Sequence, residues 1–122
     1  MSAPDTAFEL RLSAEPALAV TVRSFVAESA HKLGLDEGDI EDLRLLASEL
    51  LANAVETGGS TVTIRLDAPG GVWRLTADGI GSLGSAAPNE IIDRELLLRG
   101  LATIRMTDEG SLECSALIPA AD

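Results

Sequence analysis

The segment that decides the fold reads Ser48-Glu49-Leu50-Leu51-Ala52-Asn53-Ala54-Val55. It lies inside a longer stretch, over about residues 36–57, whose helical periodicity predicts a helix closed by Gly58-Gly59. The apolar face of this helix consists of Ile40, Leu43, Ala47, Leu50 and Ala54. A different stripe carries Asp42, Glu49, Asn53 and Glu56. Glu49 and Asn53 are four residues apart, so they lie one turn apart on the same side of the helix.

A carboxylate and an amide in this arrangement form a candidate site for magnesium and water. The amide oxygen of Asn53 is a hard, neutral ligand that suits Mg²⁺. The carboxylate of Glu49 can orient or deprotonate a water or a hydroxyl group. The alternative is a solvated polar stripe on an amphipathic helix, and spacing alone favours that alternative.

The remaining segments predict an α+β fold. Periodicity and turn residues indicate a strand at 8–12, a helix at 17–33, strands at 60–66 and 73–76, a helix at about 89–103 and a closing hairpin at 106–118. This order predicts a two-layer sandwich, a mainly antiparallel mixed sheet with helices on one face. No long linker or shift in composition divides the chain, which predicts a single domain over residues 1–122.

Two further segments could bind phosphate or a base. The Gly-rich loop Asp78-Gly79-Ile80-Gly81 follows the second of the paired strands, and its glycines allow the backbone to approach a ligand closely. Arg99-Gly100-Leu101 lies just before or within the third predicted helix, where a guanidinium and the amides of a helix N-terminus can hold phosphate oxygens. Each segment alone is a weak signal.

Charge and cysteine content exclude several classes of function. The net charge is −11, with nine basic against twenty acidic residues, which argues against direct binding to nucleic acid or to an anionic membrane and favours a basic protein partner. Cys114 is alone, so it forms no internal disulfide, and a packing role is expected. His31 is expected to be solvated at a helix end, and Trp73 to pack in the core. No signal peptide or membrane span is predicted, so a soluble, cytoplasmic protein is expected.

The order of these motifs resembles the histidine-kinase-like (GHKL) ATPase family, and more narrowly its small stand-alone members, the anti-sigma-factor serine kinases. Residues 48–55 are similar to the N box of that family, and the resemblance extends over nearly the whole chain. It implies the histidine-kinase-like ATPase fold and an ATP-binding regulatory protein that controls transcription by partner switching. Asn53 would ligate the Mg²⁺ that bridges the ATP phosphates, and Glu49 would be the general base that activates a serine hydroxyl.

The resemblance also assigns the two glycine-containing segments. Gly79 and Gly81 match the glycines of the box that shapes the adenine pocket, with Asp78 as a further cofactor-binding candidate. Arg99 and Gly100 match the Arg-Gly of the second glycine box, beside the phosphates.

The chain departs from the family pattern at several positions. With the glycines aligned, the Asp that reads adenine falls on Ala77, and Asp78 is one residue along, where a strand presents its other face. Thr57 stands where the N box often has His, and Leu98 replaces the first glycine of the Gly-Arg-Gly run. The stretch from Ser82 to Glu95 is short for an ATP lid.

Two main functions remain open. The first is a Mg-ATP-dependent protein serine/threonine kinase that sequesters a sigma factor and phosphorylates an anti-anti-sigma protein. The second is a nucleotide-blind module on the same fold that binds only its partner. A third reading, the ATPase-like part of a phosphotransfer protein, lacks an upstream helix with a phosphorylatable His. The resemblance also allows a homodimer.

Overall fold

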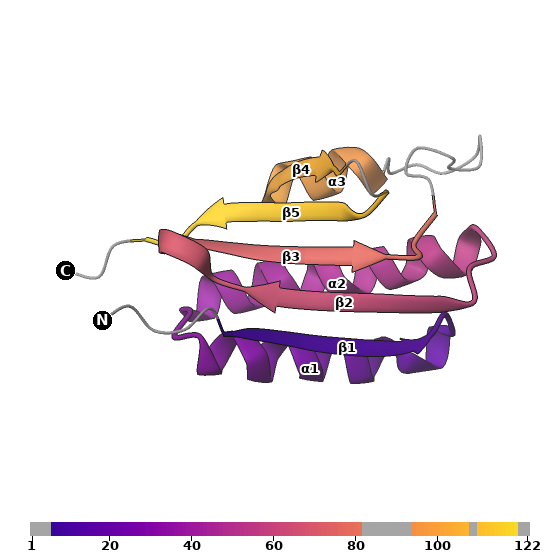
Figure 1. Cartoon of the computed structure of the whole chain (residues 1–122), viewed down its shortest axis with the longest axis horizontal. Coiled ribbons are helices and arrows are strands. Elements are labelled where there is room, and N and C mark those ends of the chain that lie inside the picture. Colours follow the sequence, from indigo (N-terminus) through magenta and orange to yellow (C-terminus); the bar gives the residue numbers. More distant parts are fainter. Residues whose placement is uncertain (1–5, 82–93, 108–109, 120–122) are drawn as a thin grey trace.

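The computed structural model of the protein describes residues 6–81, 94–107 and 110–119 (Figure 1). Its elements in chain order are β1 (Ala7–Ser13), the short 3₁₀ turn η1 (Pro16–Leu18), α1 (Ala19–Lys32), α2 (Glu37–Glu56), β2 (Thr61–Asp67), the 3₁₀ turn η2 (Pro69–Gly71), β3 (Val72–Asp78), α3 (Arg94–Leu101), β4 (Thr103–Met106) and β5 (Leu112–Leu117).

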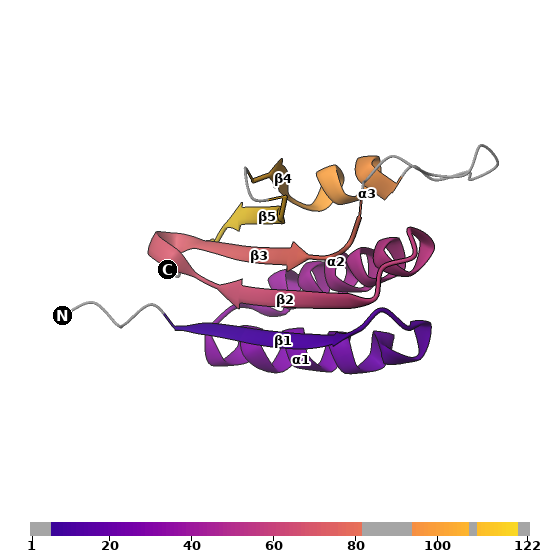
Figure 2. The same ribbon diagram turned by 45° about the vertical axis from the view of Figure 1, so that its right-hand side comes forward.

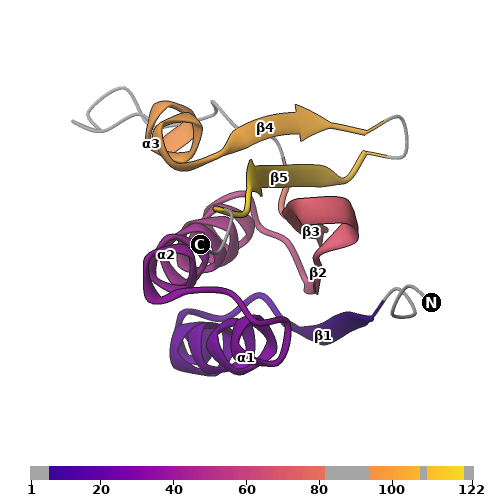
Figure 3. The ribbon, with the colours of Figure 1, turned by 90° about the vertical axis from the view of Figure 1, so that its left-hand side faces the viewer.

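The strands form one five-stranded sheet in the order β1-β2-β3-β5-β4 (Figures 1 and 2). Each of its four pairings is antiparallel, so the sheet has no mixed pairing among the described residues. Figure 3 shows α1, α2 and α3 on the same side of the strands, so no described helix covers the other face of the sheet. The predicted α+β sandwich with helices on one face is therefore confirmed.

The core lies between the helices and the inner face of the sheet. Strand residues alternate between the two faces. Eight of those that face the helices are at most 1% exposed: Val62, Ile64, Leu66, Trp73, Leu75, Ala77, Leu112 and Cys114. The outer positions of β3 between them are only partly buried or exposed. The predicted packing roles of Trp73 and Cys114 are confirmed, since both side chains are completely buried.

Helix α2 carries the predicted stripe and has well-defined ends. Its N-cap residue Asp36 accepts a hydrogen bond from the backbone N–H of Asp39 at 2.9 Å, which satisfies one of the free amides of the first turn. At its other end the N–H of Thr57 donates to the carbonyl of Asn53 at 3.0 Å, and the N–H of Gly59 donates to Ala54 at 2.8 Å. The five apolar residues of the predicted inner face are at most 2% exposed, so the helix is anchored along its whole length.

The third helix differs from its prediction. The structure describes it as α3 over Arg94–Leu101, and Thr103 belongs to strand β4 instead of the helix. Residues 89–93 lie outside the described part of the chain. The run of apolar residues at Leu96, Leu97 and Leu98 has no helical or strand period, so periodicity could not set the boundary.

Within residues 6–81, 94–107 and 110–119, none of the helices combines the length and the apolar composition that a bilayer crossing needs.

Candidate functional site

Asn53 connects the end of α2 to the Gly-rich loop that follows β3. Its side chain is 4% exposed, and its Nδ2 donates a hydrogen bond of 2.8 Å to the backbone carbonyl of Ile80. The two predicted motifs, the helix with Glu49 and Asn53 and the loop with Gly79 and Gly81, are therefore in direct contact although they are far apart in the sequence.

Thr57 reaches the same carbonyl from the end of the helix. Its Oγ1 lies 2.9 Å from the oxygen of Ile80, 2.9 Å from the oxygen of Asn53 and 3.2 Å from the oxygen of Ala54. Two donors, an amide and a hydroxyl, thus converge on the carbonyl of Ile80. We refer to Asn53, Thr57 and this carbonyl as the Ile80 junction.

The loop can make this approach because residues 79 and 81 are glycines. Gly79 and Gly81 have φ angles of 81° and 80°, which residues with a side chain rarely adopt. A Cβ atom at Gly79 would collide with the carbonyl oxygen of Thr61, and one at Gly81 would collide with Oγ1 of Thr57. Gly81 therefore allows the close contact between the loop and the end of α2, whereas Gly79 allows the close contact between the loop and β2. The spaces that their missing side chains leave are filled by the protein itself.

Glu49 lies one turn before Asn53 on α2 and is half-buried. The helix therefore places the predicted base and the predicted metal ligand on one side, as the spacing required. The other members of the stripe, Asp42 and Glu56, are partly exposed and exposed. Within this stripe only Asn53, which takes part in the Ile80 junction, is buried.

The end of β3 places Ala77 and Asp78 on opposite faces of the sheet. Ala77 pairs with Ile64 and Leu112, is completely buried, and faces the helices. The exposed Asp78 accepts a hydrogen bond from the hydroxyl of Ser111, just before β5. The position that matches the adenine-reading Asp is thus a methyl group on the inner face, and the neighbouring carboxylate points to the open face.

Arg99 and Gly100 lie at the C-terminal end of α3, and both are exposed. The expectation that helix N-terminal amides assist Arg99 in holding phosphate is wrong, because the last turn of a helix presents carbonyl oxygens instead of free amides. Leu98, at the position of the family's first glycine, is completely buried, so that position serves packing. The predicted lid, Ser82–Glu95, falls mostly on residues 82–93, outside the described residues.

The candidate residues fit the magnesium-phosphate end of a nucleotide better than they fit its base. The amide of Asn53 and the carboxylate of Glu49 supply oxygen atoms, which Mg²⁺ prefers, and Mg²⁺ usually completes its shell with phosphate oxygens and waters. The described residues hold no group of three or more His, Cys, Asp or Glu that could bind a metal by themselves. At the base end, the methyl of Ala77 offers no acceptor for an amino group.

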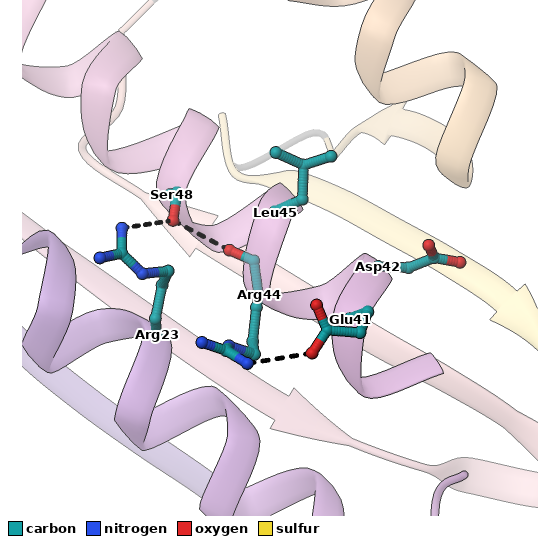
Figure 4. A pocket seen from close by; sticks show the side chains of 6 residues that line it. All are labelled: Arg23, Glu41, Asp42, Arg44, Leu45 and Ser48. Atoms are coloured by element: carbon teal, nitrogen blue, oxygen red, sulfur yellow. Dashed lines mark hydrogen bonds and ion pairs between the residues drawn. The ribbon is translucent and has the colours of Figure 1, made fainter. Parts of the chain in front are cut away.

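A separate surface pocket lies beside α1 on the outer side of α2 (Figure 4). It has a volume of about 480 Å³ and is lined by Arg23, Glu41, Asp42, Arg44, Leu45 and Ser48. Arg44 is paired with Glu41 at 3.0 Å, and Nη1 of Arg23 lies 3.4 Å from the hydroxyl of Ser48. None of the predicted site residues lines it, so it is distinct from the Ile80 junction.

Two ionisable groups in the helix–sheet layer have raised pKa values. Burial raises the pKa of the Cys114 thiol to about 12, and the charge of Glu113 adds to the shift, so the thiol stays protonated and is no nucleophile. Burial also raises the pKa of Asp39, and the nearby Asp36 and Asp42 act in the same direction, whereas the indole N–H of Trp73 opposes them. Oδ2 of Asp39 and Nε1 of Trp73 are nevertheless both buried without a well-formed hydrogen bond. The indole therefore lies near the Asp39 carboxyl without meeting the geometry of a good hydrogen bond.

Sequence reasoning missed the role of Thr57 and of the Ile80 carbonyl. Thr57 was notable only as a departure from the family pattern, and a backbone carbonyl leaves no trace in the residue types. The signal that could have pointed to Thr57 is its position at the C-cap of α2, directly before two glycines.

Comparison with known protein families identifies a match for the part of the chain that holds α2 and the Gly-rich loop. A family model described as a histidine kinase-like ATPase domain matches residues 12–90, more than half of the chain. The match includes α2 and the Gly-rich loop and ends before α3, so Arg99 and Gly100 lie outside it. A search of curated proteins finds no significant match.

Proposed function

The chain belongs to the histidine kinase-like ATPase family, and we propose that it is an ATP-binding regulatory protein of the anti-sigma-factor serine kinase type, which controls transcription by partner switching. The observation that carries this proposal is the buried Asn53, hydrogen-bonded at 2.8 Å to the Gly-rich loop and one turn from Glu49. This arrangement keeps an amide and a carboxylate together beside a loop whose backbone approaches closely.

Each residue has a definite task in the proposed site. The carboxamide of Asn53 would hold the Mg²⁺ of a bound nucleotide through its oxygen. When bound, the cation neutralises phosphate charge. Glu49 would accept the proton of a partner's serine hydroxyl at its carboxylate if the protein transfers phosphate. Gly81 keeps the loop against Thr57 at the end of α2 and Gly79 keeps it against β2, so the loop and Asn53 would border the same ligand.

The charge of the helix layer supports a basic protein partner. Residues 15–56 contain nine acidic side chains: Glu15, Glu28, Asp36, Glu37, Asp39, Glu41, Asp42, Glu49 and Glu56. The same segment contains three basic side chains: Arg23, Lys32 and Arg44. Such an excess would speed the encounter with a positively charged surface and would make the association sensitive to salt. A sigma factor and an anti-anti-sigma protein, both in the cytoplasm, are the partners that we propose.

Calorimetric titration of ATP and ADP, with and without Mg²⁺, tests nucleotide binding. We expect micromolar, Mg²⁺-dependent binding of ATP by the wild type and loss of the Mg²⁺ dependence in Asn53→Ala. Asp42→Asn, on the same helix stripe but outside the Ile80 junction, is the matched control and should bind as the wild type does. No heat at millimolar ATP from a folded protein would contradict the proposal.

A second candidate, a partner-binding module that ignores nucleotide, is favoured by the end of β3. Ala77 faces the helices and Asp78 is bonded to Ser111 on the other face, so neither offers an acceptor to an adenine amino group on the helix side. This candidate predicts salt-dependent binding to a sigma factor that is the same with ATP, with ADP and without nucleotide. A change in sigma affinity on adding Mg-ATP would exclude it.

A further inference from the structure

The Ile80 junction determines how the side chain of Asn53 is turned. A carboxamide has a nitrogen on one side and an oxygen on the other, and its Nδ2 donates to the Ile80 carbonyl at 2.8 Å. The flipped orientation would bring Oδ1 against that carbonyl oxygen, two acceptors without a proton between them. The Ile80 carbonyl therefore sets the direction in which Asn53 presents its oxygen.

Thr57 is the second group on that carbonyl, and a proton that its hydroxyl gives there joins the loop to the end of α2. Three carbonyl oxygens lie within 3.2 Å of the hydroxyl, but a hydroxyl donates only one proton. The two oxygens from α2 already accept backbone amides: Thr57 N–H donates to Asn53 at 3.0 Å, and Gly59 N–H donates to Ala54 at 2.8 Å. The oxygen of Ile80 accepts from Nδ2 of Asn53, so each of the three oxygens already has one donor. Only the Ile80 carbonyl lies outside α2, so only a proton given to it joins the loop to the helix end.

The contact on the other side of Thr57 limits how the loop can move. Gly81 packs so closely on Thr57 that a Cβ atom there would collide with the hydroxyl oxygen and come within 3.0 Å of the methyl group. The loop is therefore held by a hydrogen bond at Ile80 and by packing at Gly81, both on one side chain.

We propose that Thr57 is a positioning residue: by holding the Ile80 carbonyl, its hydroxyl fixes the orientation of the Asn53 carboxamide and thus of the oxygen that Asn53 offers to the Mg²⁺ of a nucleotide. The ligand in this inference, the Mg²⁺ of a nucleotide, comes from the proposed function. The hydrogen bonds of Asn53 and Thr57 to the Ile80 carbonyl do not depend on that function. Thr57 itself touches no phosphate in this scheme.

Two variants separate the hydroxyl from the shape of the side chain. Thr57→Val keeps the branched shape and removes the hydroxyl, whereas Thr57→Ser keeps the hydroxyl and removes the methyl. The first measurement needs no nucleotide: the two side-chain amide protons of Asn53 are followed by NMR in the folded protein. We expect them to be widely separated in chemical shift and slow to exchange in the wild type and in Thr57→Ser. In Thr57→Val they should move together and exchange at least fivefold faster.

The second measurement is the factor by which Mg²⁺ tightens ATP binding. We expect this factor to fall about five- to tenfold in Thr57→Val, the loss of one typical hydrogen bond, and to stay within twofold in Thr57→Ser. Binding of ATP in the presence of a chelator should be unchanged in both variants. An equal loss with and without Mg²⁺ would mean that Thr57 acts only on the fold and would overturn the inference.

The two measurements distinguish this inference from the proposed function. A wild type that binds no nucleotide would refute the function, and the amide protons of Asn53 would still test the junction. Unchanged amide protons in Thr57→Val would refute the positioning role even if ATP binds as proposed.

Discussion

Ala77→Asp is the substitution that we expect to strengthen adenine recognition. Ala77 is completely buried at the end of β3 and faces the helices, on the same side of the sheet as Asn53. An Asp at this position would direct a carboxylate toward the proposed base site, where it could accept a hydrogen bond from the amino group of adenine.

The expected magnitudes have opposite signs with and without nucleotide. Without it, a buried carboxylate that lacks a partner should cost about 2 kcal/mol of stability, or about 8 °C in melting temperature for a domain of this size. With it, a hydrogen bond to a charged group should contribute about 1.5–3 kcal/mol, so the affinity for ATP should rise at least tenfold. ATP at a hundred times its Kd would then restore about 2.7 kcal/mol of stability.

The assay is calorimetric titration with ATP and with GTP, combined with thermal unfolding followed by the fluorescence of Trp73. GTP carries a carbonyl instead of the amino group at the corresponding ring position, so its affinity should not rise. Asp78→Asn, on the open face, is the control and should leave both affinities unchanged. If folded Ala77→Asp binds ATP no more tightly than the wild type does, the base does not lie where the position of Ala77 implies.

Three further predictions concern stability and reactivity. Asp67, which is 5% exposed, accepts hydrogen bonds of 3.0 and 2.6 Å from the guanidinium of Arg74, whose side chain is 38% exposed. Asp67→Ala should therefore lower the free energy of unfolding in urea by about 1.5 kcal/mol, the contribution of a charged hydrogen bond, whereas Arg74→Lys should lower it by less. The pKa of Asp39 is raised above 3.8 in the folded state, so protonation of its carboxyl stabilises the folded protein. This stabilisation is complete below pH 3.8 and is lost as the pH rises through the folded pKa. Asp39→Asn should therefore be more stable than the wild type at pH 7 by a margin that disappears near pH 3.5, as measured by urea titrations of Trp73 fluorescence. Cys114, completely buried with a pKa of about 12, should react with a thiol reagent at pH 8 at least a hundredfold more slowly in the folded protein than in 6 M urea; equal rates would place the thiol at the surface.

Much of the fold could be predicted because local and long-range signals agree. Helix α2 has an N-cap at Asp36, a regular apolar face and glycines after Thr57, and its observed bounds differ little from the predicted ones. The strands alternate regularly, so the sequence predicts that Ala77 and Asp78 point to opposite faces of the sheet. The start of β4 at Thr103 did not, because a run of leucines has neither the helical nor the strand period.

The candidate site was predictable only in its local part. That Glu49 and Asn53 share a helix side follows from spacing, whereas the bond from Asn53 to the Ile80 carbonyl joins residues 27 positions apart. Whether Arg99 lies at the first or the last turn of α3 depends on where the helix begins, and the sequence defines that boundary least well. The hydroxyl of Thr57 contacts the backbone carbonyl of Ile80, and residue types do not reveal a contact with a backbone atom.

The order of the strands has a consequence for how the molecule opens. β4 is an edge strand whose neighbour in the sheet is β5, and α3 precedes it directly. Separation of β5 from β3, together with loss of the packing of α3 on α2, where Leu98 is buried, would release α3, β4 and β5 together. The strands β1, β2 and β3 and the two long helices would keep their mutual contacts. The released elements α3, β4 and β5 would then form one cooperative unfolding unit. In native-state hydrogen exchange, the amides of Thr103–Met106 and Leu112–Leu117 would share one opening free energy, lower than that of the β2 amides. The half of the fold that holds Asn53 and the Gly-rich loop would stay closed during these openings.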